Sequence, residues 1–472
     1  MKGTLAILVT ALALALAVAP TAFGRDATPS PAAGRSQLPR HVQSATAIGE
    51  VFGDGEKISA VIIEYDRDID QSKLSSAAFA VAGRTVTAVY SNNAPAKAAR
   101  GSNGRYVVVE LSPDDTDAAL FSGGPGWRGP DPDGPGGGGS GAPADPAAQA
   151  AGGRARAAGG MAALATQKPL KVTVSQIGEV TTVTGKKYPA DPVPFDSDKG
   201  VNLIVDDFKQ LEFKDPATGM MLAYNLYIPK SYDKSKSYPL VLFMHDASVT
   251  GAETSRTLTQ GLGAVVWATP AEQSKHAAFV LAPAFGRGVS TEGTVGDATG
   301  DTVVDLVNSV TSRYSIDRNR IYTTGQSFGC MLSLAIMIRH PDLFAASMLV
   351  AGQRDAQATS VLNHNKMWII VAQGDTRAFP GMNESVAVWE KEGTKVSKAI
   401  WNARSSEAEL TVAANRMVAE GNNIKYAIFQ KGTVFPAGQE EGIEHMATWP
   451  VAYRIEGVRD WLFTQMKSPA VQ

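Results

Sequence analysis

The stretch Arg320-Ile321-Tyr322-Thr323-Thr324-Gly325-Gln326-Ser327-Phe328-Gly329 decides the fold of this chain. It joins a short apolar-rich run to a Gly-x-Ser-x-Gly pattern, and residues 330–337 that follow are typical of a helix. A strand, a sharp turn and a helix in this order form the nucleophile elbow of an α/β-hydrolase. The turn holds the serine in a strained backbone with its hydroxyl exposed, and the flanking glycines let strand and helix pass closely. The pattern therefore predicts Ser327 as a nucleophile.

Two residues further along the chain complete a set of nucleophile, acid and base. Apolar runs predict three buried strands after the elbow, at residues 344–350, 367–372 and 424–429. The second of these strands leads into Gln373-Gly374-Asp375, and His445 lies in the loop after the third. The order Ser327, Asp375, His445 is the order found in α/β-hydrolases. Each residue follows the C-terminal end of a predicted strand, where open parallel sheets place their ligands.

The roles of these residues follow from their proton chemistry. A serine hydroxyl is a weak nucleophile at neutral pH, so a base must take its proton as it attacks. The imidazole of His445 titrates near neutrality and can act as this base. A carboxylate on the other ring nitrogen fixes the tautomer, and we assign this role to Asp375. Asp355, which follows the preceding strand, is the alternative acid, and otherwise it is a solvated loop charge.

Acyl transfer also requires hydrogen-bond donors for the developing oxyanion. The backbone N–H of Phe328, directly after the nucleophile, is the first expected donor. The second should come from the loop after an early strand, which the apolar run over residues 238–244 predicts. Asp246 replaces the usual glycine of that loop, and we favour the N–H of Ala247 as the donor. His245 is expected to hold the loop rather than to act as a second base.

Several further segments of the chain are similar to one known family. They are residues 222–229, 238–245, 267–270, 280–283 and 317–327, with His445, Trp449, Tyr453 and residues 460–463. Together they resemble the secreted α/β-hydrolase esterases that carry an N-terminal immunoglobulin-like (Ig-like) domain, a group also described as prolyl-oligopeptidase-like or as a peptidase family. The resemblance extends from about Val201 to the C-terminus and more loosely over the N-terminal part. It implies a doubly wound, mostly parallel sheet with helices, and serine esterase chemistry.

The elbow departs from the usual sequence of that family at two positions. Phe328 and Cys330 replace the methionine and the final glycine of Gly-Gln-Ser-Met-Gly-Gly. Neither side chain takes part in the chemistry, so the departure bears on the shape of the pocket. Cys330 is the one cysteine of the chain, and we expect a small apolar filler there rather than a catalytic thiol.

The composition is that of a large globular protein, and the sequence contains no motif for a cofactor. The chain has 472 residues, of which 44% are hydrophobic, and its net charge of −2 gives no sign of nucleic-acid binding. A single cysteine cannot form an intramolecular disulfide, so the core must stabilise the fold. No Cys/His cluster, His-Glu-x-x-His pattern or phosphate loop is present in the sequence, and we expect neither a metal nor an organic cofactor.

The N-terminus has the features of a secretory signal peptide over residues 1–24. Lys2 precedes an apolar stretch over residues 5–19, and small residues follow at positions 22–24. The stretch is short for a membrane span, although a retained anchor is the alternative. We therefore expect a secreted or periplasmic protein with no membrane contact after signal removal.

The rest of the chain divides into two domains. Short alternating runs over residues 43–187 predict a small Ig-like β-sandwich, interrupted by a Gly/Pro/Ala-rich segment over residues 113–167 that we expect to be a disordered insertion. Residues 188–200 are rich in proline and aspartate and are predicted to be a connector. The catalytic α/β domain is predicted over residues 201–467.

Three classes of function fit this sequence. The first is a secreted serine carboxylesterase acting on small or medium acyl esters, including plant-polymer side groups and polyesters. The second is a serine peptidase of the prolyl-oligopeptidase type, but the region before the α/β domain is too short for the β-propeller such enzymes carry. The third is a catalytically silent binding protein, against which the complete Ser, Asp and His set argues. The acyl and alcohol preference, the role of the sandwich and the oligomeric state stay open.

Overall fold

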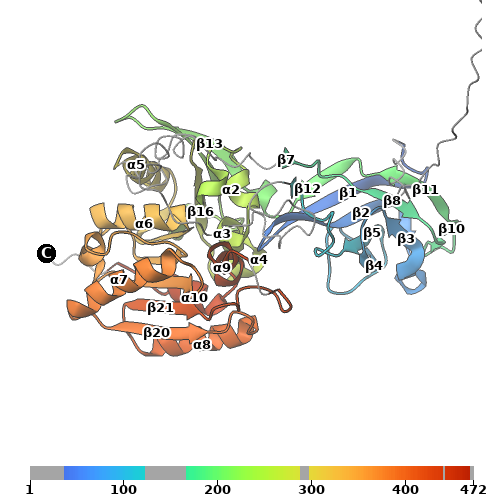
Figure 1. Cartoon of the computed structure of the whole chain (residues 1–472). Coiled ribbons are helices and arrows are strands. Elements are labelled where there is room, and N and C mark those ends of the chain that lie inside the picture. Colours follow the sequence, from blue (N-terminus) through green and yellow to red (C-terminus); the bar gives the residue numbers. More distant parts are fainter. Residues whose placement is uncertain (1–36, 123–165, 287–296, 440–441, 468–472) are drawn as a thin grey trace, which may run out of the picture.

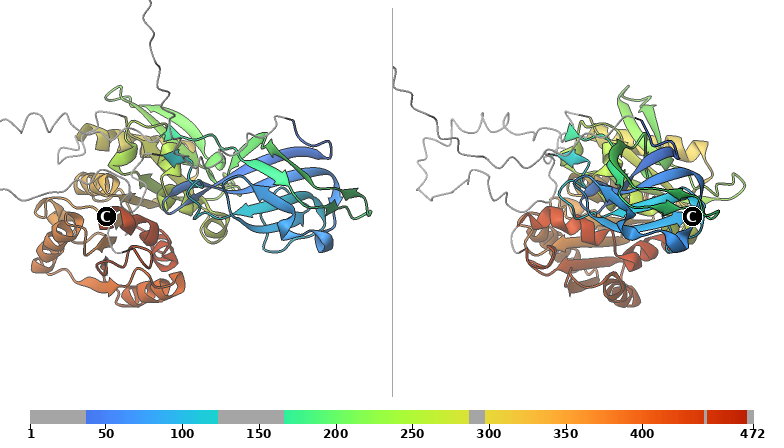
Figure 2. Two further views of the ribbon diagram at one scale, coloured as in Figure 1. Left: turned by 45° about the vertical axis from the view of Figure 1, so that its right-hand side comes forward. Right: turned by 90° about the vertical axis from the view of Figure 1, so that its right-hand side faces the viewer.

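The computed structural model describes residues 37–122, 166–286, 297–439 and 442–467. A β-rich N-terminal part (blue to green) lies beside a larger α/β part that continues to the C-terminus (Figure 1). Figure 2 shows the same two parts from two further directions. This arrangement confirms the predicted fold class, a small β-sandwich followed by an α/β-hydrolase sheet. The predicted signal peptide, residues 1–24, lies outside the described residues.

Two sheets form the N-terminal sandwich. The larger has the order β12-β1-β2-β5-β4, and the smaller has the order β11-β8-β3. Alternate side chains of β2, including Val61, Ile63 and Tyr65, point into the core between the sheets, whereas Ala60 and Ile62 pack on the outer face. The strands of the two sheets are β1 (Val42–Phe52), β2 (Gly55–Ile69), β3 (Phe79–Val81), β4 (Val86–Asn92), β5 (Gly104–Leu111), β8 (Thr173–Gln176), β11 (Asp191–Asp196) and β12 (Lys199–Asn202).

The predicted connector over residues 188–200 belongs to the sandwich instead. β11 pairs with β8, β12 pairs with β1, and Phe195 is buried in the sandwich core. Prolines are tolerated in β11 because it is an edge strand, where the missing N–H groups interrupt no ladder. The prediction of a connector, which was based on the proline content, was therefore wrong, because the segment contains an edge strand.

The predicted insertion is also narrower on its N-terminal side. Ala118 and Leu120 are buried, and the N–H of Leu120 donates to the carbonyl of Glu56 at 3.0 Å. The next residues form β6 (Phe121–Ser122), which pairs with β7 (Thr166–Gln167). These buried side chains and the ion pair of Asp115 with Arg84 at 3.0 Å join this stretch to the sandwich, although its other residues are mostly Asp, Ser and Thr. The remainder of the predicted insertion, residues 123–165, lies outside the described residues.

A nine-stranded sheet forms the centre of the α/β part. Its order is β13-β14-β16-β15-β17-β18-β19-β21-β20, and the strands from β16 to β20 are parallel. β14 is antiparallel to both of its neighbours. The strands are β13 (Lys209–Lys214), β14 (Met221–Tyr227), β15 (Tyr238–Met244), β16 (Phe279–Ala284), β17 (Ile316–Gln326), β18 (Ala346–Val350), β19 (Met367–Ala372), β20 (Val396–Trp401) and β21 (Ile424–Phe429). Two short strands of the sandwich, β9 (Val180–Thr181) and β10 (Lys187–Tyr188), pair with each other.

Helices cover both faces of this sheet. Val241 and Phe243 of β15 pack with α3, α8, α9 and α10, whereas Leu240 and Leu242 pack with α5, α6 and α7. Burial on both faces explains why the parallel strands are almost continuously apolar. The helices are α2 (Arg256–Thr259), α3 (Leu262–Val265), α4 (Pro270–Lys275), α5 (Asp297–Arg313), α6 (Phe328–Arg339), α7 (Ala378–Lys391), α8 (Glu407–Ala419), α9 (Glu444–Ala452) and α10 (Glu456–Phe463). Short 3-10 helices are η1 (Gln71–Lys73), η2 (Ser76–Ala78), η3 (Val205–Asp207), η4 (Ala247–Val249), η5 (Val266–Ala268) and η6 (Ala358–Leu362).

In the part of the chain that the structure describes, no helix has the length and apolar character of a membrane span.

Candidate active site

Ser327 stands on a sharp turn between β17 and α6. Its backbone has φ 51° and ψ −117°, a region that non-glycine residues rarely occupy. A Cβ added at Gly329 would lie 1.9 Å from the carbonyl oxygen of Met244, and one at Gly325 would lie 2.5 Å from the backbone of Gly329. Both glycines are therefore needed for the close passage of strand β15, strand β17 and helix α6. This strained turn presents the serine hydroxyl at the carboxyl end of the sheet.

The structure brings the predicted serine, histidine and aspartate together. His445 Nε2 lies 2.8 Å from Ser327 Oγ, and His445 Nδ1 lies 2.6 Å from Asp375 Oδ2. Because an ionised carboxylate can only accept, Nδ1–H donates to Asp375 and leaves Nε2 free to accept the serine proton. The alternative acid, Asp355, is exposed and accepts a hydrogen bond from the N–H of Ala358 at 2.8 Å. It thus binds the first N–H of η6 and is not a partner of the histidine.

Asp375 is held in its charged form by hydrogen bonds. Burial alone would raise the pKa of this carboxyl, but its hydrogen bond to His445 and those to two backbone N–H groups lower the pKa below its usual range. The N–H groups of Arg377 and Ala378 add two donors to Oδ1, at 3.0 and 2.9 Å. A carboxylate with three donors stays ionised and fixes the orientation of the imidazole.

Glu444 is a site residue that the sequence did not reveal. Its Oε2 accepts from the N–H of Gly374 at 2.7 Å, and its Oε1 accepts from the N–H of Gly432 at 2.8 Å. The buried carboxylate thus ties the first turn of α9, which carries His445, to the loop that carries Asp375. In the sequence it is one more acidic residue of a loop, and only its position directly before His445 sets it apart.

The side chains behind the elbow are tightly packed. Cys330 is fully buried, and burial raises the pKa of its thiol to about 12, so the thiol is neutral. A Cβ at Gly352 would lie 2.6 Å from the Cβ of Cys330, so the Cys330 side chain fills the space beside Gly352. On the other side, Trp449 packs edge-on against the His445 ring, with centroids 5.6 Å apart.

The two predicted oxyanion donors lie at the start of helical turns. Ala247 is the first residue of η4, which follows β15, and Phe328 is the first residue of α6. The first N–H groups of a helical turn have no acceptor inside that turn, so they are available to a ligand. His245 is fully buried, with Nδ1 donating to the carbonyl of Asp246 at 2.7 Å and Nε2 accepting from the N–H of Phe285 at 3.0 Å. Both ring nitrogens are thus used in holding the loop, and burial lowers the pKa of the imidazole.

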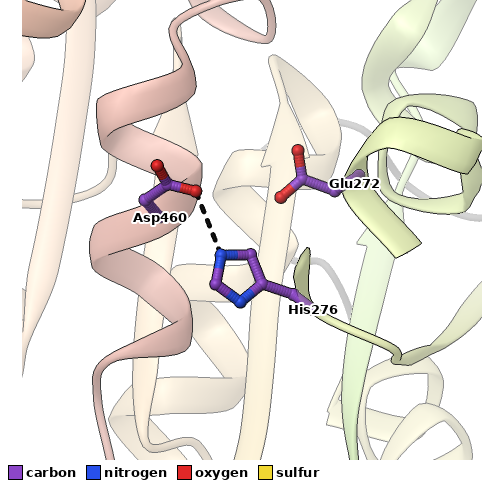
Figure 3. A group of neighbouring side chains, drawn as sticks. All are labelled: Glu272, His276 and Asp460. Atoms are coloured by element: carbon purple, nitrogen blue, oxygen red, sulfur yellow. Dashed lines mark hydrogen bonds and ion pairs between the residues drawn. The ribbon is translucent and has the colours of Figure 1, made fainter. Parts of the chain in front are cut away.

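A second group of titratable side chains lies away from this site. Glu272, His276 and Asp460 offer ligand atoms within 4.8 Å of one another, a set that could bind a metal ion (Figure 3). Both carboxylates already have cationic partners, since Arg459 lies 2.9 Å from Glu272 and Lys275 lies 2.9 Å from Asp460. These ion pairs, with the 3.0 Å contact between His276 and Asp460, fasten α10 to α4.

Comparison with known proteins gives two family matches. Residues 44–189 match the family described as esterase Ig-like N-terminal domain, and residues 222–408 match the family described as esterase PHB depolymerase. The second match includes Ser327 and Asp375, and His445 lies beyond its end.

Curated relatives are similar over part of their length. The chain is 26% identical to poly(3-hydroxyalkanoate) depolymerase C of Paucimonas lemoignei, over 39% of this chain and 44% of that protein. It is 29% identical to acetylxylan esterase A of Aspergillus ficuum, over 21% of this chain and 34% of that protein. The chain thus spans less than half the length of these relatives.

One solved structure is similar over nearly the whole chain. It is the crystal structure of a thermostable esterase, with 27% identity and a TM-score of 0.69, covering 90% of this chain and all of that chain. The resemblance that the sequence indicated is thereby confirmed for both domains. This chain belongs to the α/β-hydrolase esterases that carry an N-terminal Ig-like domain.

Proposed function

We propose that this protein is a serine carboxylesterase that hydrolyses acyl esters through an acyl-enzyme on Ser327. The observation that carries the proposal is the unbroken hydrogen-bond chain from Ser327 through His445 to Asp375. The strained elbow and the esterase family matches on both domains support it.

In the first half of the reaction, Ser327 Oγ attacks the carbonyl carbon of the ester while His445 Nε2 takes the hydroxyl proton. The carbonyl oxygen becomes an oxyanion that accepts from the N–H groups of Phe328 and Ala247. Asp375 stabilises the imidazolium that forms. The tetrahedral intermediate then collapses, His445 returns the proton to the leaving alkoxide, and the alcohol departs.

In the second half, a water molecule attacks the acyl-enzyme. His445 takes a proton from the water as it adds to the acyl carbon, and it later gives that proton back to Ser327 Oγ. The carboxylic acid leaves and the hydroxyl is restored. Every proton in this cycle moves between oxygen atoms and one imidazole nitrogen.

For the substrate, we propose esters of secondary alcohols carried on a polymer. The two curated relatives are named for a poly(3-hydroxyalkanoate) and for an acetylated xylan. In both polymers an acyl group is joined to a secondary alcohol oxygen. This shared chemistry favours a site that accepts a branched carbon on the alcohol side.

A graded series of p-nitrophenyl esters, beside peptide anilides, tests the reaction class. Ester turnover that disappears in Ser327→Ala is the expected result, and anilide turnover exceeding ester turnover would point to a peptidase instead. Release of acetate from acetylated xylan and of hydroxyacids from a poly(3-hydroxyalkanoate) suspension tests the substrate class. Hydrolysis of primary but not secondary alkyl esters would contradict it.

We also propose export of the protein, supported by the apolar leader within residues 1–24. N-terminal sequencing of exported protein should give a start near Arg25, and an intact Met1 terminus would reject the proposal.

A further inference from the structure

Arg256 of α2 lies at the boundary between the sandwich and the α/β part. Its guanidinium carbon lies 3.7 Å from the centre of the Phe121 ring, and Phe121 belongs to strand β6 of the N-terminal part. Its Nη1 donates to Thr259 Oγ1 at 3.2 Å. A guanidinium stacked on an aromatic face in this way is attracted by the ring quadrupole, more so where water is excluded. Arg256 is thus held by a residue from the other domain.

Two buried carboxylates act on Arg256 from opposite domains. Glu56 of β2 and Asp246 of the loop after β15 are both 2% exposed. Burial lowers the pKa of Arg256 to about 10, against the effect of the two carboxylates, so the guanidinium stays charged at neutral pH. Neither carboxylate oxygen of Glu56 has a hydrogen-bond partner among the described residues. Arg256 is therefore a cation whose charge acts on both carboxylates.

Asp246 in turn holds the two segments that meet at the nucleophile. Its Oδ1 accepts from the N–H of Ser248 at 2.8 Å, and its Oδ2 accepts from Gln326 Nε2 at 3.0 Å. Ala247, with its proposed oxyanion donor, lies between Asp246 and Ser248, and Gln326 directly precedes Ser327. The Asp246 carboxylate thus joins residues 246–248, here called the oxyanion loop, to the elbow at Ser327.

The hairpin between β1 and β2 strengthens this contact between the domains. A Cβ added at Gly53, at the tip of the hairpin, would lie 2.6 Å from Pro450 of α9. A Cβ added at Gly261, just after α2, would lie 3.0 Å from the carbonyl oxygen of Gly53. The hairpin therefore touches both the helix that carries His445 and the segment that carries Arg256, with no room for another side chain at either contact.

We propose that Arg256 is a positioning residue through which Glu56 and Phe121 of the sandwich hold the oxyanion loop in register with Ser327. The inference rests on the proposed ester hydrolysis. Arg256 touches neither Ser327 nor His445 and acts through Asp246. A guanidinium that served only to join the domains would change stability and leave the rate of the chemical steps as it is.

The test compares Arg256→Gln and Arg256→Lys with the wild type on a p-nitrophenyl ester, together with inhibition by an alkylboronic acid. The boronic acid adds to Ser327 as a tetrahedral anion, so its affinity reports on oxyanion stabilisation. Arg256→Gln should lower kcat about tenfold to a hundredfold, with KM within about twofold, and should weaken boronate binding in proportion. Arg256→Lys keeps the positive charge beside Asp246 and should recover most of both losses.

Two further variants follow the path into the sandwich. Phe121→Ala and Glu56→Gln should each lower kcat several-fold at pH 8.5, and neither should add to the loss in an Arg256→Gln background. The charged groups that act on Glu56 are Arg256 of α2 and Asp206 of η3. Glu50→Gln is the matched control, because Glu50 lies on the same hairpin and its ion pair with Lys97 is on the surface.

An Arg256→Gln enzyme with wild-type kcat, or with altered KM but unaltered boronate affinity, would overturn the inference. If that variant does not fold, wild-type kcat in both Phe121→Ala and Glu56→Gln would overturn it equally. Ester turnover by the wild type and by Glu50→Gln, absent in Ser327→Ala, tests the proposed function separately.

Discussion

Glu444 accepts a hydrogen bond of 2.7 Å from the backbone N–H of Gly374, and this bond joins the loops that carry His445 and Asp375. A Cβ at Gly374 would lie 2.1 Å from the Glu444 carboxyl carbon, so any other residue there would displace that carboxylate. The pairing of base and acid therefore depends on a neighbouring carboxylate as well as on their own contact.

Replacement of Glu444 by alanine should slow the enzyme more than it weakens substrate binding. The N–H groups of Gly374 and Gly432 would lose their acceptor in a partly buried place, at a cost of up to about 1–3 kcal/mol for each. The first turn of α9 would then shift His445 relative to Asp375, and we expect kcat to fall at least tenfold with KM nearly unchanged. Steady-state kinetics on a p-nitrophenyl ester measures this, and Glu407→Ala, on the exposed first turn of α8, is the control. Equal effects of the two substitutions would contradict the positioning role.

Variants of the two candidate acids should separate them clearly. Asp375→Asn leaves an amide opposite His445 Nδ1 and favours the wrong tautomer, so we expect a loss in kcat of roughly a thousandfold or more. Ser327→Ala and His445→Ala should be equally inactive while the protein stays folded. Asp355→Asn should keep wild-type kcat, because Asp355 accepts from the N–H of Ala358 in η6 and does not contact the histidine. Sensitivity of kcat to Asp355 instead would mean that the acid has been misassigned.

The site residues found from the sequence are those fixed by local geometry. The elbow around Ser327 has a required spacing of glycines, and Asp375 directly follows a strand whose apolar run, residues 367–372, coincides with β19. By contrast, Glu444 and Gly374 are 70 residues apart, and no local pattern indicates a hydrogen bond between them. Asp246 departs from the expected glycine, and its contact with Gln326 appears only when two strands are placed side by side.

The same limit applies to the strand order and the domain boundary. β21 lies between β19 and β20, an order that no feature of the sequence separately specifies. Because of Pro192 and Pro194, the segment of β11 was predicted to be a connector. The sequence does not show that this strand lies at the edge of a sheet, where prolines are tolerated. Long-range pairing therefore decided both features.

Glu56 should make the stability of the protein depend on pH. Burial raises the pKa of Glu56 from 4.5 to about 7 in the folded protein, despite the opposing effect of Arg256. The folded state then holds a proton that the unfolded state releases above pH 4.5, so this stabilising contribution is complete below 4.5 and is lost as the pH rises through 7. Glu56→Gln has no proton to lose, and its unfolding free energy relative to wild type should rise by about 3 kcal/mol between pH 4.5 and pH 8.

Urea unfolding at the two pH values measures this difference, with Glu50→Gln as a control that should show none. A pH-independent difference would show that Glu56 is not a buried acid of raised pKa. The expected gain in stability is opposite in sign to the loss in kcat proposed for the same variant. A purely structural role for Glu56 could not produce both.

The pairing of β6 with β7 predicts that residues 123–165 can be replaced by a short turn. Ser122 pairs with Thr166 in antiparallel register, so the ends of this segment are already as close as the ends of a hairpin. A loop of four Gly and Ser residues can close such a hairpin, and shortening a long loop changes stability by only about a kilocalorie. The variant should therefore keep the melting temperature within a few degrees and the turnover of a small p-nitrophenyl ester within about twofold. A control that also removes Phe121 and Ser122 should have a kcat lowered several-fold, because the ring under Arg256 is then absent. Failure of the first variant to fold, while the wild type folds, would show that residues 123–165 contribute to the packed sandwich and that its boundary must be redrawn.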